Sequence, residues 1–314
     1  MRIGRYISLP DIEAQLAPNN YSCSHSILYT YDCYTHLGAN LTVKIDGHWT
    51  LQGGVSPGCA PAPWTTDAQV TGSFCIVYTW SNGGDVSNFR DNTIKNGKYA
   101  YNNLTAIYET WYHKINDHWH TDTEMWYQYM KDTPNMWWYK TGVPYNKVSS
   151  PWPENTGNYH LLPSEAMPST LNFGVVCENP SSSYTGSRAA YCYAPDWAIT
   201  NYLEHNLWKN QASLNIRNER VDDHKGRRTG TPAIYEKHMV GFDFWAGSSV
   251  TFRPELSYIH SFSPYVLRTM DMAPGSSVAA LSNVPAGQLR NATMKALGAK
   301  TQSLILAADL IWHF

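Results

Sequence analysis

The stretch LGANLTVKIDGHWTLQGGV, residues 37–55, decides the fold. Apolar and polar side chains alternate along it with a period of two, which is typical of strands with one apolar and one polar face. In its middle stands the dipeptide Asp46-Gly47, a strong signal for a tight hairpin turn. The stretch therefore predicts two antiparallel strands, residues 35–45 and 48–56, joined by a short turn.

The same alternation recurs along most of the chain, whereas helical periodicity is nearly absent. Only residues 276–300 are compatible with a short helix, and Pro285 interrupts it. Most of the alternating segments reach the roughly 9 to 11 residues that a tilted strand needs to cross a bilayer, against an average of about 5 to 6 in globular proteins. The predicted strands are residues 2–8, 35–45, 48–56, 69–80, 86–95, 103–115, 118–130, 196–207, 212–222, 233–246, 249–261 and 303–314.

Tight turns alternate with longer loops between these strands. A soluble β-sandwich has no need for such alternation, but outer-membrane barrels have short periplasmic turns and longer extracellular loops. The pattern therefore predicts an all-β, transmembrane, antiparallel up-and-down β-barrel whose last strand runs toward the periplasm. The long loops are expected at residues 57–68, 96–102, 131–195, 223–232 and 262–302, with 131–195 and 262–302 the longest on the extracellular side.

Composition excludes several classes of protein. Of the 314 residues, only 15% are charged and 14% are aromatic, whereas a typical globular domain is about 25% charged. The formal net charge of −2 argues against a nucleic-acid partner, because binding nucleic acid normally requires a basic excess. No apolar run approaches the roughly 18 to 20 residues of a membrane-spanning helix.

Cysteine and histidine spacing predicts no metal site and no cofactor. The six cysteines include no CxxC pair. Cys177 and Cys192 flank a polar, Ser-rich stretch that suits a loop disulfide in an oxidising compartment, and two free thiols explain the same stretch equally well. His118 and His120 share one strand face, as two metal ligands do, but no third ligand accompanies them.

Aromatic and charged side chains indicate which solvent each strand face meets. Trp and Tyr residues fall near the ends of the predicted strands, as they do in the girdles of barrels at lipid–water boundaries. Charged side chains occur on the polar faces, where burial in a dry core would cost roughly several kcal/mol each and a water-filled lumen would not. The pore-lining candidates are Lys44, Gln52, Glu109, His120, Asp122, Glu124, Gln128, Arg217, Glu219, Arg253 and Glu255.

Six segments, spread over nearly the whole chain, resemble the OmpL-like β-barrel porins of Gram-negative bacteria. Their order along the chain is more specific than any one of them. The segments are RIGRYISLPDIEAQLAPNNY at 2–21, KYAYNNL…TWYHK at 98–114, DWAITNYLE at 196–204, IRNERVDDHKGRRTG at 216–230, FRPELSYIH at 252–260 and LIWHF at 310–314.

The resemblance implies a single barrel domain over residues 1–314 in the cell outer membrane, with at least 12 strands in this chain. It also implies a water-filled pore for passive diffusion of small hydrophilic solutes, with no catalytic residues. The expected partners are outer-membrane lipids and lipopolysaccharide, small solutes and, as an open alternative, further copies of the chain in a homo-oligomer. The aromatic Phe314 resembles the C-terminal signal by which such barrels are recognised for insertion.

The front of the chain departs from the family pattern. Full members resemble secreted precursors with several strands before the GRYISLPD segment, so the resemblance implies N-terminal truncation and an incompletely closed barrel. Residues 9–34 are expected to form either another strand or an inward-folded constriction. The constriction is favoured, because two extra strands there would leave a rather long periplasmic turn.

A second class of function, a secreted all-β carbohydrate-binding or glycoside-hydrolysing protein, explains the aromatic residues equally well. Asp122 and Glu124 share one strand face, and Glu109 is expected opposite them across the Asn116-Asp117 hairpin, which suits a carboxylate set for glycoside hydrolysis. Carboxylates that face water in a pore explain the same pattern. The pore is favoured because no pKa-raising pocket follows from the sequence. The secreted alternative predicts solubility without detergent.

Overall fold

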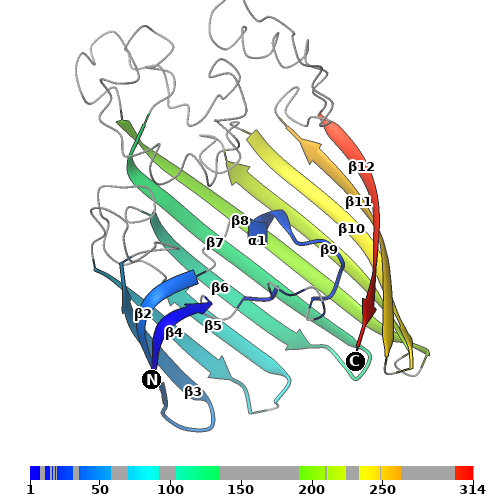
Figure 1. Ribbon diagram of the computed structural model, residues 1–314, viewed down its shortest axis with the longest axis horizontal. Coiled ribbons are helices and arrows are strands. Elements are labelled where there is room, and N and C mark those ends of the chain that lie inside the picture. The colour runs from blue at the N-terminus through cyan, green and yellow to red at the C-terminus, as the bar shows by residue number, and fades with distance from the viewer. Residues whose placement is uncertain are drawn as a thin grey trace, which may run out of the picture.

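The computed structural model describes residues 1–7, 11–14, 16, 18, 20–30, 35–57, 70–81, 83–91, 104–134, 191–208, 211–223, 233–247, 249–262 and 301–313. In these residues the chain is almost entirely β-structure (Figure 1). The elements are β1 Arg2–Ile7, α1 Ile27–Thr30, β2 Thr35–Lys44, β3 Trp49–Ser56, β4 Thr71–Thr79, β5 Asp85–Asp91, β6 Leu104–Lys114, β7 Trp119–Pro134, β8 Tyr191–Leu207, β9 Ala212–Asp223, β10 Ala233–Ala246, β11 Val250–Ser261 and β12 Gln302–Trp312.

All twelve strands belong to one antiparallel sheet, in which each strand pairs with its neighbours in chain order from β1 to β12. This meander confirms the predicted all-β, up-and-down architecture. The sheet curves as the wall of a barrel does, and α1 lies against its concave side (Figure 1). Strands β1 and β12 form the two edges, with no pairing between them in the described residues. No helix in that part of the chain has the length and apolar character needed to span a membrane.

The predicted strand ranges agree with the structure except around the third long loop. Strand β7 continues to Pro134 and β8 begins at Tyr191, so the expectation of a loop over the whole of 131–195 is wrong at both ends. A register shift between Met130 and Thr133 interrupts the β7–β8 pairing. Pro195 has no N–H to donate to the ladder, which is why it indicates a strand end in the sequence. Residues 135–190 and 263–300, with the candidate helix 276–300 and Cys177, lie outside the described residues.

The convex face of the sheet is predominantly apolar. Its most exposed side chains include Leu304, Leu306 and Leu310 on β12, at 68%, 81% and 67% of their full accessible area. Large apolar side chains from β2, β3 and β4 also point outward. No second sheet covers this face within the described residues, so the convex face does not pack as a sandwich core would. In a barrel wall it is the face that meets acyl chains.

Two of the tight turns at one end of the sheet share one local device. The Asp46 carboxylate accepts hydrogen bonds from the backbone N–H groups of His48 and Trp49, each at 2.7 Å. Asn116 repeats this with the N–H groups of His118 and Trp119, at 2.8 and 3.0 Å. Because these N–H groups stabilise the carboxylate, the pKa of Asp46 lies below its ordinary value.

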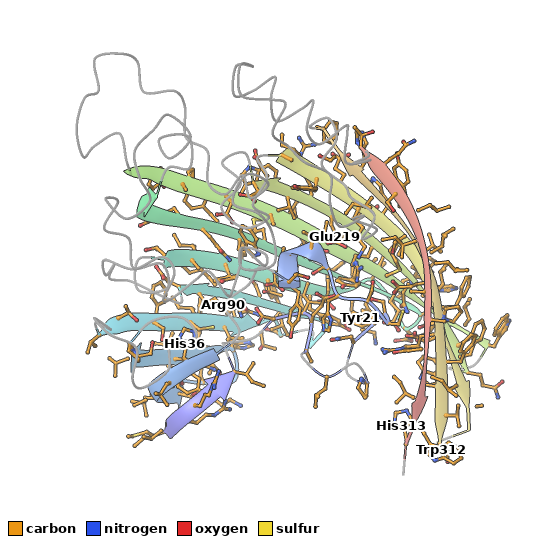
Figure 2. All side chains as sticks on the ribbon, turned by 45° about the horizontal axis from the view of Figure 1, so that its top comes forward. Tyr21, His36, Arg90, Glu219, Trp312 and His313 are labelled. Atoms are coloured by element: carbon orange, nitrogen blue, oxygen red, sulfur yellow. The ribbon has the colours of Figure 1, made fainter. Side chains whose placement is uncertain are left out.

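Aromatic side chains line the same end of the sheet on its convex face. Trp49 packs on Tyr78 with ring centroids 4.6 Å apart, and Trp119 stacks on His205 at 4.0 Å. Trp312 lies at the corresponding end of β12 (Figure 2). This row agrees with the expected girdle of aromatic residues.

Two glycines on the paired strands β2 and β3 give a matched test of the sheet. A Cβ at Gly38 would overlap the carbonyl oxygen of Val55, whereas a Cβ at Gly53 meets nothing within 4 Å. Gly38→Ala is therefore expected to lower the free energy of unfolding by about 1–3 kcal/mol, as overpacking does. Gly53→Ala is the control and is expected to be close to wild type. Urea unfolding in detergent, followed by tryptophan fluorescence, measures both; equal midpoints for the two variants would contradict the close approach.

Candidate functional site

The concave face of the sheet holds the candidate site. Along every strand the side chains that point to this face alternate with the lipid-side residues, and from β5 to β11 most of them are buried. Many are charged, including Arg90, Glu124, Arg217 and Glu219. They are buried because residues 11–14, 16, 18 and 20–30, here called the inner segment, lie across them (Figure 2).

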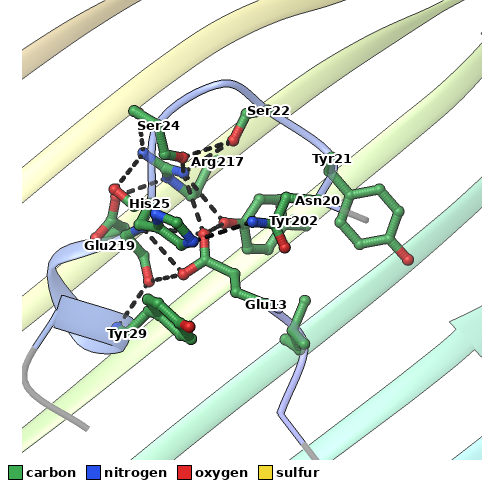
Figure 3. Close-up of polar contacts among 12 residues, drawn as sticks. Glu13, Asn20, Tyr21, Ser22, Ser24, His25, Tyr29, Tyr202, Arg217 and Glu219 are labelled. Carbon is green, nitrogen blue, oxygen red and sulfur yellow. Dashed lines mark hydrogen bonds and ion pairs between the residues drawn. The ribbon is translucent and has the colours of Figure 1, made fainter. Parts of the chain in front are cut away.

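Arg217 on β9 is the hub that holds the inner segment. Its guanidinium donates hydrogen bonds to the Ser24 carbonyl at 2.7 Å, the Ser24 hydroxyl at 3.0 Å and the His25 carbonyl at 3.2 Å (Figure 3). It also donates to the Ser22 hydroxyl at 3.0 Å. The side chain of Arg217 is fully buried. A single barrel side chain thus replaces water for several polar groups of a loop that makes few backbone hydrogen bonds of its own.

Two glutamates balance the charge of Arg217. The Glu219 carboxylate, one position further along the same face of β9, lies 2.7 Å from the guanidinium. Glu13 comes from the inner segment itself and lies 3.4 Å away. Glu13 also accepts hydrogen bonds from the Ser26 backbone N–H at 3.0 Å, from the Ser26 hydroxyl at 2.5 Å and from Tyr202 on β8. The buried cation is therefore paired from both the wall and the segment.

Carboxylates of the barrel wall also bind the backbone of the inner segment. Glu124 accepts a hydrogen bond from the Ile12 N–H at 3.0 Å, and Glu255 accepts one from the Ser24 N–H at 3.0 Å. Glu219 accepts the N–H of Ile27, in the first turn of α1. Charge-assisted hydrogen bonds of this kind are stronger than neutral ones. The wall thus fixes the segment at three separated points along its length.

Aromatic side chains and a second arginine complete the contact. Arg90 on β5 pairs with Asp11 of the inner segment and lies 4.0 Å from the centre of the Tyr108 ring. The Tyr21 hydroxyl donates to Asp122 at 2.6 Å. Trp126, which is buried, donates from its indole nitrogen to the Leu28 carbonyl at 3.3 Å.

The inner segment carries two groups whose pKa is displaced by this environment. Burial, reinforced by the neighbouring Asp122 carboxylate, raises the pKa of the Tyr21 hydroxyl. Burial and then the nearby Glu255 raise the pKa of the Cys23 thiol to about 12. Cys23 and Cys75 are free thiols among the cysteines that the structure describes. Because a thiolate is the reactive form, the docked segment suppresses the reactivity of Cys23.

All but one of the predicted pore-lining residues lie on the concave face of the sheet. His120, Asp122, Glu124 and Gln128 lie in one row on β7. The remaining concave-face residues are Lys44 and Gln52, near the turn between β2 and β3, with Arg217 and Glu219 on β9 and Arg253 and Glu255 on β11.

Glu109 is the exception, and the prediction that it lines the pore is wrong. It pairs with Phe89 on β5 and Met125 on β7, and all three side chains are exposed on the convex face. Asp122 pairs instead with Tyr112. The carboxylate set suggested for glycoside hydrolysis therefore does not form, because Glu109 and Asp122 lie on opposite sides of the sheet.

Other residues of the site were not among the sequence candidates. Glu204 and Tyr202 follow the alternation of β8, so the pairing of β7 with β8 would have shown both to share the face of Asp122. Arg90 stands on the short strand β5, which has a weak pattern. Glu13 and Asp11 precede any regular element, and no spacing rule indicates where they point.

A cavity of about 480 Å³ lies beside the inner segment, toward the end of the sheet that carries the tight turns. No group of three or more His, Cys, Asp or Glu side chains in the described residues is arranged as a metal site. The cavity is lined by residues of both signs and by aromatic rings, among them Asn20, Tyr21, Glu204, Asp243, Trp245, Arg253 and His313.

Three solved structures have a partly similar arrangement of strands. The outer membrane channel DcaP of Acinetobacter baumannii superposes with a TM-score of 0.47 and 9% identity, over 82% of this chain and 65% of that one. OmpT of Vibrio cholerae gives 0.42 and 12%, with the same coverage. OccK2 of Pseudomonas aeruginosa gives 0.40 and 10%, over 72% of this chain and 54% of that one. This chain thus spans less than two thirds of the length of each of these structures.

Sequence comparison gives a direct assignment. No curated protein sequence matches the chain. A family model does match: the one described as "Putative beta-barrel porin-2, OmpL-like", over residues 1–281. This family confirms the resemblance deduced from the sequence segments and indicates the outer membrane as the location. The chain belongs to the OmpL-like β-barrel porin family.

Proposed function

We propose that the protein forms an outer-membrane pore through which small hydrophilic solutes diffuse passively. The single observation that carries this proposal is the division of one curved sheet into an apolar convex face and a charged, polar concave face. A barrel wall of this kind separates lipid from an aqueous lumen. The family assignment supports it.

The inner segment acts in this proposal as the constriction of the pore. It crosses the concave side and is bound there through Arg217, Arg90 and the carboxylates that accept its N–H groups. A segment fixed at so many points narrows the lumen permanently and does not need a separate gate. Solutes pass between it and the parts of the wall that it leaves uncovered.

Charge around the constriction favours cations. Several wall carboxylates are bound by backbone N–H groups or by tyrosine hydroxyls, which stabilise the negative charge without cancelling it. Carboxylate rings of this kind select for cations in channels. The carboxylates outnumber the cationic groups: Asp11, Glu13, Asp122, Glu124, Glu204, Glu219, Asp243, Glu255 and Asp309 surround Arg90, Arg217, Lys237 and Arg253.

The first prediction concerns pore formation by the full-length protein. Reconstituted into planar bilayers, it is expected to give discrete conductance steps that are independent of voltage polarity, because the constriction is fixed. Proteoliposomes are expected to swell faster in a small sugar than in a larger one. A folded, heat-modifiable protein that gives neither conductance nor swelling would refute the pore.

The second prediction concerns the hub of the constriction. Arg217→Ala leaves the buried Glu13 carboxylate without its cation and leaves Glu219 with only Lys237, 3.8 Å away; breaking a buried ion pair typically costs about 3–5 kcal/mol. The inner segment is therefore expected to detach, which raises single-channel conductance and speeds alkylation of Cys23, located by mass spectrometry of the labelled peptide.

Arg220→Ala is the matched control for this variant. Arg220 lies three positions along the same strand but pairs with Glu236 on the convex face, at 43% exposure, and exposed pairs contribute about 0–1 kcal/mol. This variant is expected to keep wild-type conductance and slow labelling. If Arg217→Ala also keeps both, the inner segment is not held by the hub.

The third prediction concerns ion selectivity. In a tenfold KCl gradient the reversal potential is expected to have the sign of K⁺ permeation. The double variant Glu204→Gln and Asp243→Asn removes two charges from the cavity wall and is expected to shift the potential toward zero. Glu236→Gln, on the convex face, is the control and should change nothing. A wild-type reversal potential on the chloride side contradicts the charge assignment.

A further inference from the structure

A row of polar side chains crosses the predominantly apolar convex face. Thr123 on β7, Asn201 on β8, Asn218 on β9 and His238 on β10 are direct cross-strand partners. We call these four residues the outer polar row. Asn218 and His238 are exposed. Asn218 lies in the middle of β9, so the row runs at the depth of the hydrocarbon core and not at the level of the lipid headgroups.

Hydrogen bonds within the row satisfy only part of its polar groups. The Asn201 amide nitrogen donates to the Thr121 and Thr123 hydroxyls, at 2.9 and 2.8 Å. The His238 Nδ1 lies 2.8 Å from the Asn218 side-chain oxygen. Because that oxygen only accepts, Nδ1 carries the hydrogen and donates. The Asn218 amide nitrogen and the His238 Nε2 have no hydrogen-bond partner among the described residues, and both residues are exposed.

Glu109 on β6 stands beside one end of this row. It is the diagonal neighbour of Thr123, because it pairs with Met125 two residues further along β7. Its exposed carboxylate makes no hydrogen bond or ion pair within the described part of the chain. The convex face thus carries an acid at β6 and a histidine at β10, separated by a hydrogen-bonding row.

Acyl chains cannot satisfy these groups. In hydrocarbon an unpartnered polar group is costly, and polar side chains at such depth are stabilised by pairing with another protein surface. Other polar side chains of this face are paired within the sheet: Arg220 with Glu236 at 2.7 Å, His113 with Asp85 at 2.5 Å and Tyr258 with Gln302 at 3.0 Å. The outer polar row and Glu109 differ from them in having polar groups that the described part of the sheet leaves without a partner. The convex surfaces of β12 and β3 show Leu304, Leu306 and Leu310, and Leu51 and Val55.

We propose that β6–β10 is the interface through which a second copy of this chain docks in the membrane, with Glu109 of one copy facing His238 of the next. The acid and the histidine lie at opposite ends of the same surface. A two-fold axis along the membrane normal therefore places Glu109 of each copy opposite His238 of the other, which makes the contact isologous and the assembly a dimer. Glu109 offers hydrogen-bond acceptors, and His238 with the amides between the two residues can hydrogen-bond across the junction.

The test measures the mass of the full-length protein in mild detergent, by light scattering coupled to size exclusion and by native mass spectrometry. Wild type is expected as an oligomer. The double variant Asn218→Leu and His238→Leu is expected as a monomer, and because it only adds apolar surface to the lipid side it should insert normally. Val240→Leu, at the next outward position of β10, is the control and should stay oligomeric.

A charge exchange tests the pairing itself. Glu109→Lys is expected to abolish the oligomer by placing a cation opposite His238, and Glu109→Lys combined with His238→Glu is expected to restore it. Heat modifiability in gels confirms that each variant is folded. A monomeric wild type, an oligomer that survives the double leucine variant, or a monomer that carries bound lipid overturns the proposal. Since the readout is mass, its result is independent of conductance.

Discussion

Everything in this structure depends on the alternation of side chains across a single sheet between two solvents. In a sheet that meets lipid on one side, an outward residue must be apolar or find a partner, and charged residues without such a partner are driven to the other side. The leucines of β12 and the charged row of β7 are two consequences of this one constraint. The backbone is satisfied by the ladder itself, so the side chains alone decide what the two faces do.

The strands and their order could be predicted because this constraint produces a visible alternation of apolar and polar residues in the sequence. Period-two alternation in residues 37–55 and a tight Asp-Gly turn fix the register of β2 and β3. Alternation and the tight turn at Gly247 fix the register of β10 and β11. Side chains alternate between the two faces of a strand, so most inward-facing residues can be predicted once the face of one residue on that strand is known. Arg217, Glu219, Arg253 and Glu255 were found in this way.

Glu109 could not be placed correctly because β6 carries apolar and aromatic residues on both faces. Ala106 and Tyr108 point inward, while Ile107 and Trp111 point outward. Hydropathy therefore does not show which alternate residues of this strand face inward. Only the register of the Asn116 hairpin, which pairs Lys114 with His120, shows that Glu109 lies outward. Chemistry alone assigns a charged residue to the water side, but the register of the hairpin places Glu109 on the convex face.

The path of the inner segment cannot be predicted from the sequence pattern either. Long-range side-chain contacts hold this segment in place, and its sequence has no periodicity that indicates them. Its acids, Asp11 and Glu13, meet wall arginines more than 70 residues away in the chain. The wall in turn offers carboxylates to the N–H groups of the segment, so binding the segment consumes few of the negative charges. Wall carboxylates that bind the backbone N–H groups of the inner segment therefore keep the wall next to the segment negatively charged. In the pore that we propose, anchoring and ion preference then arise from the same residues.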